Sequence, residues 1–100
     1  MATTTKALAR IAAATSSTTL YTVPSATTTV VTNIVVTNSA ASAATFTITL
    51  DSVDLFKTTA IAANTTAMFD LKQVLATTKI IAGFASAVTV SFHISGVEIA

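Results

Sequence analysis

The stretch TFTITL, residues 45–50, decides the fold, because an apolar side chain occupies every second position. Successive side chains of a β-strand point to opposite faces of a sheet. This period of two therefore predicts a strand with one buried and one polar face. The stretches TAMFDL at 66–71 and VTVSFHIS at 88–95 alternate in the same way. Together they predict an all-β chain.

The stretch TTTVVTNIVV, residues 27–36, is apolar on both phases instead. A strand that is apolar on both faces is covered on both faces. Two covers are open at this point: another subunit, or the N-terminal segment of the same chain folded back over the strand.

Turn-forming residues separate the strands. Pro24 cannot donate to a sheet ladder, and Asp51-Ser52-Val53-Asp54 is typical of a hairpin turn. Gly96 falls where the apolar phase of the last strand changes, so we expect a β-bulge there. The predicted strands are 19–23, 28–38, 44–50, 54–60, 65–72, 79–84 and 87–99. About seven short strands at regular spacing predict a small antiparallel β-sandwich, jelly-roll-like, over residues 18–100.

Residues 1–17 are predicted to form an N-terminal arm outside this domain. Leu8, Ile11 and Ala12 have helical spacing, which allows one short amphipathic turn. Such a turn is too short to be stable alone. The arm is therefore either disordered or ordered by a neighbour, and we favour ordering on a partner's surface. We expect its deletion to leave the sandwich folded.

The composition favours a protein that shares its surface with partners. Hydrophobic residues make up 52% of the chain and charged residues only 9%, against roughly 25% charged in typical domains. The net charge is +1 and the basic residues are scattered, which argues against nucleic-acid binding. Cysteine is absent, and no apolar run reaches the length of a membrane span. We expect a homo-oligomer with no cofactor and no membrane contact.

The single histidine, His93, lies on the polar phase of its strand beside Ser91 and Ser95. A serine nucleophile with a histidine base also needs an orienting acid and an oxyanion hole, and the sequence offers neither. We predict that the chain is not an enzyme and that His93 is a surface or interface residue. At an interface it would make assembly depend on pH.

The acidic residues suggest no strong metal site. Asp51 and Asp54 lie in one turn, but calcium takes six or more oxygen ligands, so capping of the turn backbone is the better interpretation. Asp70 and Lys72 share a strand face, and we interpret them as solvated residues that contribute little free energy. Met68 shares that face and marks a candidate packing surface.

The aromatic residues are predicted to build the core. Phe46, Phe69 and Phe92 fall on inward phases, so they are not expected to stack on a bound sugar. Tyr21 is the one aromatic residue with a polar tip, and we expect its hydroxyl to be hydrogen-bonded near Pro24.

Three blocks of the sequence resemble a group of small proteins of tailed bacteriophages. They are Thr19–Pro24 running into Thr29–Asn38, then Ala60–Thr65 leading to Phe69-Asp70-Leu71, and finally Val90–Glu98. The resemblance spans about residues 18–99. In two turns this chain departs from that group, which often has glycine where the chain has Pro24-Ser25-Ala26 and Ala76-Thr77-Thr78.

The resemblance implies a virion structural protein. The expected role is a capsid decoration, or cement, protein that binds the outer surface of the major capsid protein, as a trimer at capsid threefold points. The alternatives are a neck, tail or fibre component, or a module that binds glycans on the host surface. The candidate interface residues are Leu8, Ile11, Val31, Val35 and Met68.

Overall fold

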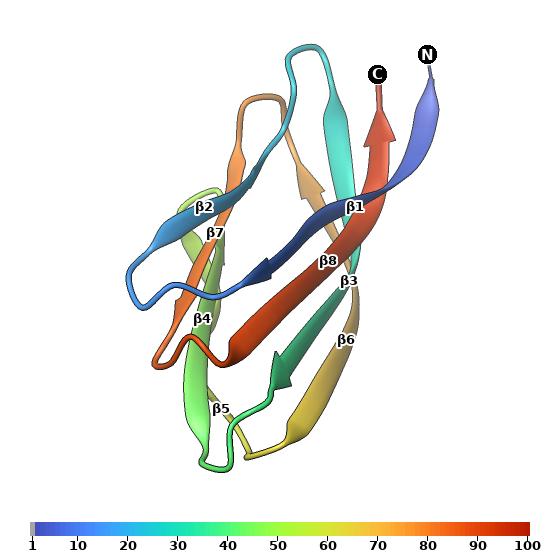
Figure 1. The fold of residues 1–100 in the computed structure, drawn as a ribbon. Helices are drawn as coiled ribbons and strands as arrows, with labels where there is room; N and C mark the ends of the chain where they lie inside the picture. The colour runs from blue at the N-terminus through green and yellow to red at the C-terminus, as the bar shows by residue number, and fades with distance from the viewer. Residues whose placement is uncertain (1) are drawn as a thin grey trace.

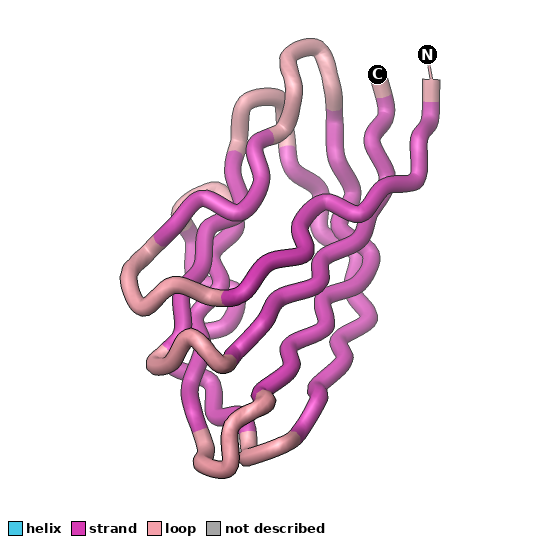
Figure 2. The backbone as a smooth tube through the Cα atoms, viewed as in Figure 1, coloured by secondary structure: helices cyan, strands magenta, loops and turns pink. Residues whose placement is uncertain are grey.

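The computed structural model describes residues 2–100 and contains eight β-strands and no helix in that range. The strands are β1 (Thr3–Ala12), β2 (Thr18–Thr22), β3 (Thr28–Asn38), β4 (Ala44–Leu50), β5 (Val53–Ile61), β6 (Thr65–Leu75), β7 (Ile80–Ala85) and β8 (Val90–Ile99). They form two four-stranded antiparallel sheets that pack face to face (Figure 1 and Figure 2). The predicted β-sandwich is confirmed.

The order of the strands is that of a jelly roll. Sheet A has the order β1-β8-β3-β6 and sheet B the order β2-β7-β4-β5. Strand β1 pairs with β8, β2 with β7, β3 with β6 and β4 with β5. The chain is therefore one long antiparallel ribbon of four strand pairs, rolled up so that the pairs alternate between the sheets.

The predicted N-terminal arm is wrong over residues 3–12, because these residues form β1, an edge strand of sheet A. They pair with β8 along the length of the strand, and Leu8 is buried in the core. A bulge at Leu8 inserts one extra residue opposite Ser95 and Ile94. The bulge breaks the period of two, which is why the spacing of Leu8 and Ile11 resembles that of a helix.

A second bulge explains why β3 looks apolar on both phases. Thr32 is the extra residue opposite β8, so Val31 and Ile34, three positions apart, both point into the core. Val35 lies on the outer face of sheet A, where it is half-buried between its neighbouring strands. The expected second cover, whether a subunit or the N-terminal segment, is therefore not required to explain the pattern.

The bulge predicted at Gly96 lies in the neighbouring strands instead. Strand β8 keeps one phase, and the extra residues sit beside it in β1 and β3. Gly96 has a different role, because it allows Leu8 and the backbone of β3 to lie close to β8. A Cβ at this position would lie 2.9 Å from Leu8 Cδ1 and would collide with the carbonyl oxygen of Val30.

The core is centred on aromatic rings from both sheets, as predicted. Phe46 lies between Phe56 at 5.6 Å, Phe92 at 6.2 Å and Phe69 at 6.3 Å, measured between ring centroids. Phe46 and Phe92 are almost completely buried. Tilted and edge-on pairs at these distances are favourable beyond the apolar area that they bury.

Several turns depend on residues with positive φ. Asp51 and Ser52 have φ values of 52° and 63°, the signature of a two-residue type I′ hairpin, so the predicted turn is confirmed. Ala26 and Thr78 have φ values of 54° and 67°. These are the two turns in which the resemblance leads one to expect glycine, and both residues adopt the conformation that glycine tolerates best.

Candidate interaction surface

His93 lies on the outer face of sheet A, on the same phase of β8 as Ser91 and Ser95. Its cross-strand neighbours are Arg10 on β1 and Val35 on β3, and neither can orient an imidazole as a carboxylate does. Within residues 2–100 no three acidic, histidine or cysteine side chains lie close enough to hold a metal ion. The same range contains no helix that could cross a membrane.

The two aspartates of the β4–β5 hairpin are each matched by a lysine. Asp51 lies 3.6 Å from Lys79, and Asp54 lies 3.8 Å from Lys57. All four side chains are well exposed, so these pairs contribute little stability. In each pair the lysine ammonium group is the positive charge that faces the carboxylate.

The outer face of sheet A presents two of the candidate residues, Val35 and Met68, side by side. Cross-strand pairing aligns its side chains in rows across all four strands. One row runs from Arg10 through His93 and Val35 to Met68. The adjacent row, towards the chain termini, runs from Ala7 through Ser95 and Asn33 to Asp70. A third row, further in the same direction, runs from Thr5 through Val97 and Val30 to Val74.

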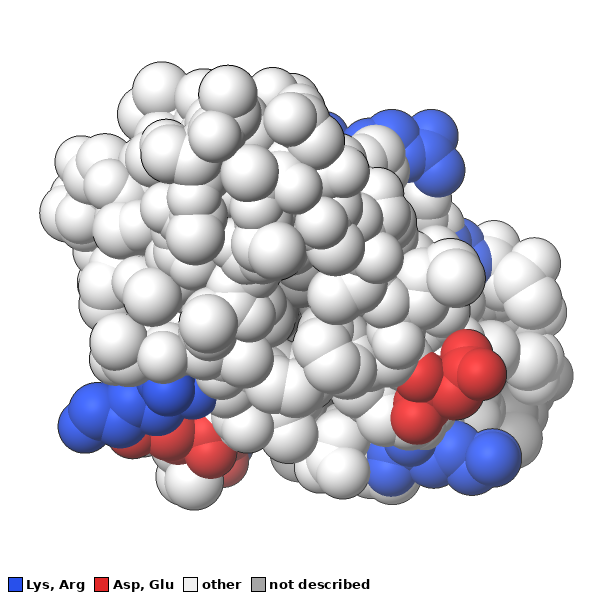
Figure 3. All heavy atoms as spheres, turned by 90° about the horizontal axis from the view of Figure 1, so that it is seen from below, with Lys and Arg blue, Asp and Glu red and all other residues white. Residues whose placement is uncertain are grey.

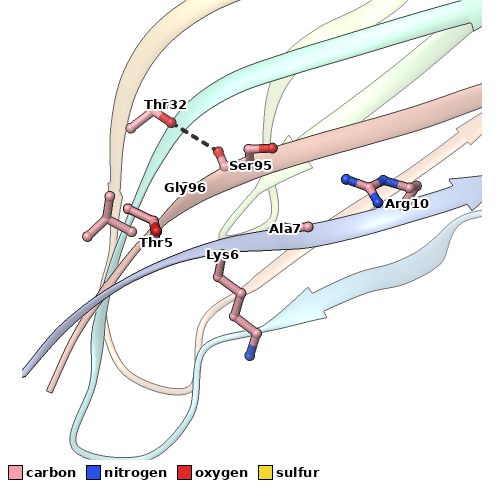
Figure 4. Close-up of a pocket in the computed structure, with 8 residues that line it drawn as sticks. Thr5, Lys6, Ala7, Arg10, Thr32, Ser95 and Gly96 are labelled. Carbon is pink, nitrogen blue, oxygen red and sulfur yellow. Dashed lines mark hydrogen bonds between the residues drawn. The ribbon is translucent and has the colours of Figure 1, made fainter.

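The face is hollow over β1 and β8 and carries an exposed methionine on β6, at the opposite edge. An open depression of about 400 Å³ lies over β1 and β8 at the level of their bulge. Figure 4 shows Thr5, Ser95, Thr32 and Arg10 around it, with Lys6 directed to the opposite side of β1. The Thr32 hydroxyl donates to the Ser95 carbonyl oxygen at 3.3 Å. At the other edge, Met68 is 74% exposed.

A polar cluster closes one end of the sandwich, next to the chain termini. The Tyr21 hydroxyl donates to Glu98 Oε2 at 2.5 Å and lies 2.8 Å from the Thr29 hydroxyl, while Lys6 Nζ lies 3.4 Å from the same Glu98 oxygen. Burial, followed by the bond to Glu98, raises the pKa of Tyr21. The bond from Tyr21 is the main cause that lowers the pKa of Glu98. The predicted contact of the Tyr21 hydroxyl near Pro24 is wrong.

Asn38 organises the opposite end, which we call the loop end. Its buried amide donates to the carbonyl oxygens of Ser42 at 2.9 Å and Ala62 at 3.3 Å. Its side-chain oxygen accepts from the Ala40 backbone at 3.1 Å and from the Thr89 hydroxyl at 3.2 Å. One side chain thus fixes three loops to one another. The loop end consists of the connections 13–17, 39–43, 62–64 and 86–89.

The loop end carries no charged residue. Its side chains are those of alanine, serine, threonine, valine and asparagine. Seen from below in Figure 3, the middle of this end is white and the charged atoms lie around its rim. Charged residues are depleted in the centres of protein interfaces, because a charge is costly to desolvate. The loop end therefore shares one property with the centre of an interface, the absence of charge, whereas its alanine and serine side chains are not the types enriched there.

The structure divides the five candidate interface residues into three groups. Leu8 and Val31 are buried in the core, so they cannot contact a partner while the chain is folded. Ile11 lies at the open edge of β1 and is 46% exposed. Val35 and Met68 are direct cross-strand neighbours on the outer face of sheet A. The structure thus joins two of the five in one surface.

Sequence reasoning missed Asn38, Arg10 and Glu98. The asparagine follows a run of β-branched residues at a strand end, which was a signal for a structural amide. Because the sequence predicts residues 1–17 to be an arm outside the domain, it does not place Arg10 beside His93. Glu98 lies on the inward phase of β8, and no local signal reveals that its partners come from β1 and β2.

Comparison of the chain with protein-family models, curated protein sequences and solved structures gives no significant match.

Proposed function

We propose that this protein is a non-enzymatic structural component of a tailed-bacteriophage particle, and that it decorates the head by binding the outer surface of the major capsid protein. The observation that carries the proposal is the uncharged loop end, which Asn38 holds in one arrangement. A preorganised surface of small uncharged side chains loses little conformational entropy on binding and desolvates no charge.

Two further observations support this role. The jelly roll is the architecture of many viral capsid domains, although a shared fold is only an analogy for function. The three sequence blocks that resemble small phage proteins lie on β2–β3, β5–β6 and β8, which include the strands that lead into and out of the loop end. Repetition over many symmetric sites would make a modest contact at each site effective in stiffening a shell.

The glycan-binding alternative has less support. Jelly rolls also occur in lectins, but sugar sites use exposed aromatic rings. Here Phe46, Phe56, Phe69 and Phe92 face one another in the core. A neck, tail or fibre component would use the same kind of contact surface, and the number of copies in each particle distinguishes it from a decoration protein.

Binding to purified particles that lack this protein tests the proposed contact. Ala41→Glu and Ala62→Glu each place a charge on an exposed position of the loop end. We expect each to reduce occupancy on the particle at least about tenfold, because the charge must be desolvated. Ser25→Glu, on an exposed turn at the other end, is the matched control and should bind normally. Equal binding by all three variants would contradict the assignment of the loop end.

A further inference from the structure

We propose that the outer face of sheet A binds a second copy of this chain, sheet against sheet, about a two-fold axis parallel to the strands. The proposal does not rest on the virion role, because it uses only the shape and charge of this face. The loop end remains free in such a dimer, since it lies at the end of the strands.

The centre of the face has the composition of an interface. Val30, Val35 and Val97 are half-buried on the central strands, and Met68 and Val74 on β6 are 74% and 69% exposed. The rows across the four strands present roughly 20 residues, the lower end of the 20–30 that each side of a stable interface contributes. Stacked sheets of this kind pack about 10 Å apart.

Charge selects a second copy as the occupant. Arg10 lies on β1 at one edge of the face and Asp70 on β6 at the opposite edge. Neither forms an ion pair among residues 2–100, and Asp70 accepts only a 3.4 Å bond from Asn33. Three strand spacings, about 14 Å, separate the two edges within one chain. The opposite charges can therefore meet only between chains.

The direction of the axis follows from the register. A two-fold axis parallel to the strands places β6 of one copy over β1 of the other, at the same level along the strands. Asp70 shares its row with Ala7, so the partner's Asp70 lies over the hollow, one row from Arg10. The partner's Lys72 falls on the side of Asp70 away from Arg10. An axis across the strands would place β1 on β1, where no carboxylate faces Arg10.

The shapes of the two faces also favour this arrangement. The hollow of one copy receives the β6 edge of the other, where the Met68 side chain is exposed. The strand edges are less suited to pairing, because bulges interrupt both β1 and β6. Charged residues on these edge strands, among them Lys6 and Lys72, oppose the addition of a further strand.

The first test is sedimentation equilibrium of the full chain and five variants. We expect a dimer whose dissociation constant rises at least about tenfold in Arg10→Asp and in Asp70→Arg, because each change replaces two attractive contacts by repulsive ones. The double variant restores both pairs and should recover the dimer. Met68→Glu should also weaken it. Val53→Glu, at an equally exposed valine in sheet B, is the control. Circular dichroism checks that each variant is folded.

A second test fixes the axis. The chain has no cysteine, so Thr5→Cys with Val74→Cys provides two defined thiols, one on each edge of the face. A short bis-maleimide should link two chains of the double variant, and neither single variant. Linking by Thr5→Cys alone would overturn the parallel axis. A monomer at every concentration, a trimer, or a dimer that ignores both the charge reversals and Met68→Glu would overturn the proposal itself.

Discussion

Thr78 holds a backbone conformation that a β-branched residue rarely adopts. Its φ of 67° lies in the left-handed region, where a side chain with a Cβ costs roughly 1–2 kcal/mol. The turn nevertheless keeps its hydrogen bonds, from Thr78 N to the Val23 oxygen at 3.1 Å and from Lys79 N to the Ala76 oxygen at 3.2 Å. These hydrogen bonds therefore hold Thr78 in its strained conformation.

Thr78→Gly should stabilise the protein. Relief of strain exceeds the entropy that glycine adds to the unfolded chain, so we expect a gain of about 1 kcal/mol in the free energy of unfolding, with a smaller gain for Ala26→Gly. Urea titration measures both. Ala41→Gly, at an exposed loop position without a positive φ, is the control and should not stabilise. A loss of stability in Thr78→Gly would refute the assignment of strain.

The contact between Tyr21 and Glu98 should make stability depend on pH at both extremes. The pKa of Glu98 is lowered by its bond from Tyr21, so its contribution is complete above the ordinary glutamate value of about 4.3 and is lost as the pH falls below it. The pKa of Tyr21 is raised by burial, so its contribution is complete below about 10 and is lost as the pH rises further.

Tyr21→Phe removes the tyrosine titration and the main cause that lowers the pKa of Glu98, and it leaves the ring in place. We expect a lower melting temperature near neutral pH, because Thr29 loses its partner. We also expect a flatter dependence on pH than in the parent chain. Thermal melts from about pH 3 to pH 11 measure this. Glu98→Gln is the companion variant and should flatten the acid side. Parallel curves for parent and variants would show that the contact does not form.

At the scale of the element, the sequence predicts strands well where the period of two is unbroken. The predicted bounds of β3 and β4 agree with the structure at every residue. Strand β1 was missed because the bulge at Leu8 shifts the phase within a segment of small residues. A bulge leaves no composition signal of its own, and whether one exists depends on the neighbouring strand.

The candidate surface was predictable only in part, for a related reason. Met68 and His93 could be placed on polar phases from the alternation alone. Their alignment in one row with Arg10 and Val35 depends on register across four strands. Register is set by contacts between strands distant in sequence, and a single strand's pattern does not contain it.

Strand β1 should be necessary for the fold. Removal of β1 leaves the edge of β8 unpaired and takes Leu8 out of the core. A chain that begins at residue 14 should therefore lose its cooperative thermal transition. Within the full chain, Leu8→Ala should cost about 2–4 kcal/mol. Ile11→Ala, at a residue that is 46% exposed, should cost less than half as much. A truncated chain that melts like the parent would restore the interpretation of this segment as an arm.

The whole molecule is elongated, with extents of 46 × 21 × 17 Å, and its charge is unevenly placed. Ion pairs gather towards the end that carries the termini and the β4–β5 hairpin, while the loop end has no charge. The outer face of sheet A, with its hollow over β1 and β8, lies along the side and is the surface proposed to bind a second copy. If both proposals hold, the uncharged end binds the particle while the side of the molecule binds a second copy.

The amount of this chain relative to the major capsid protein in purified particles tests the proposed role most directly. Quantitative mass spectrometry of intact particles provides the ratio. A decoration protein predicts a ratio near one, or a simple fraction of one set by the symmetry axis that it occupies. A ratio near one hundredth would move the protein to the neck or tail. Absence from the particle would contradict the virion role altogether.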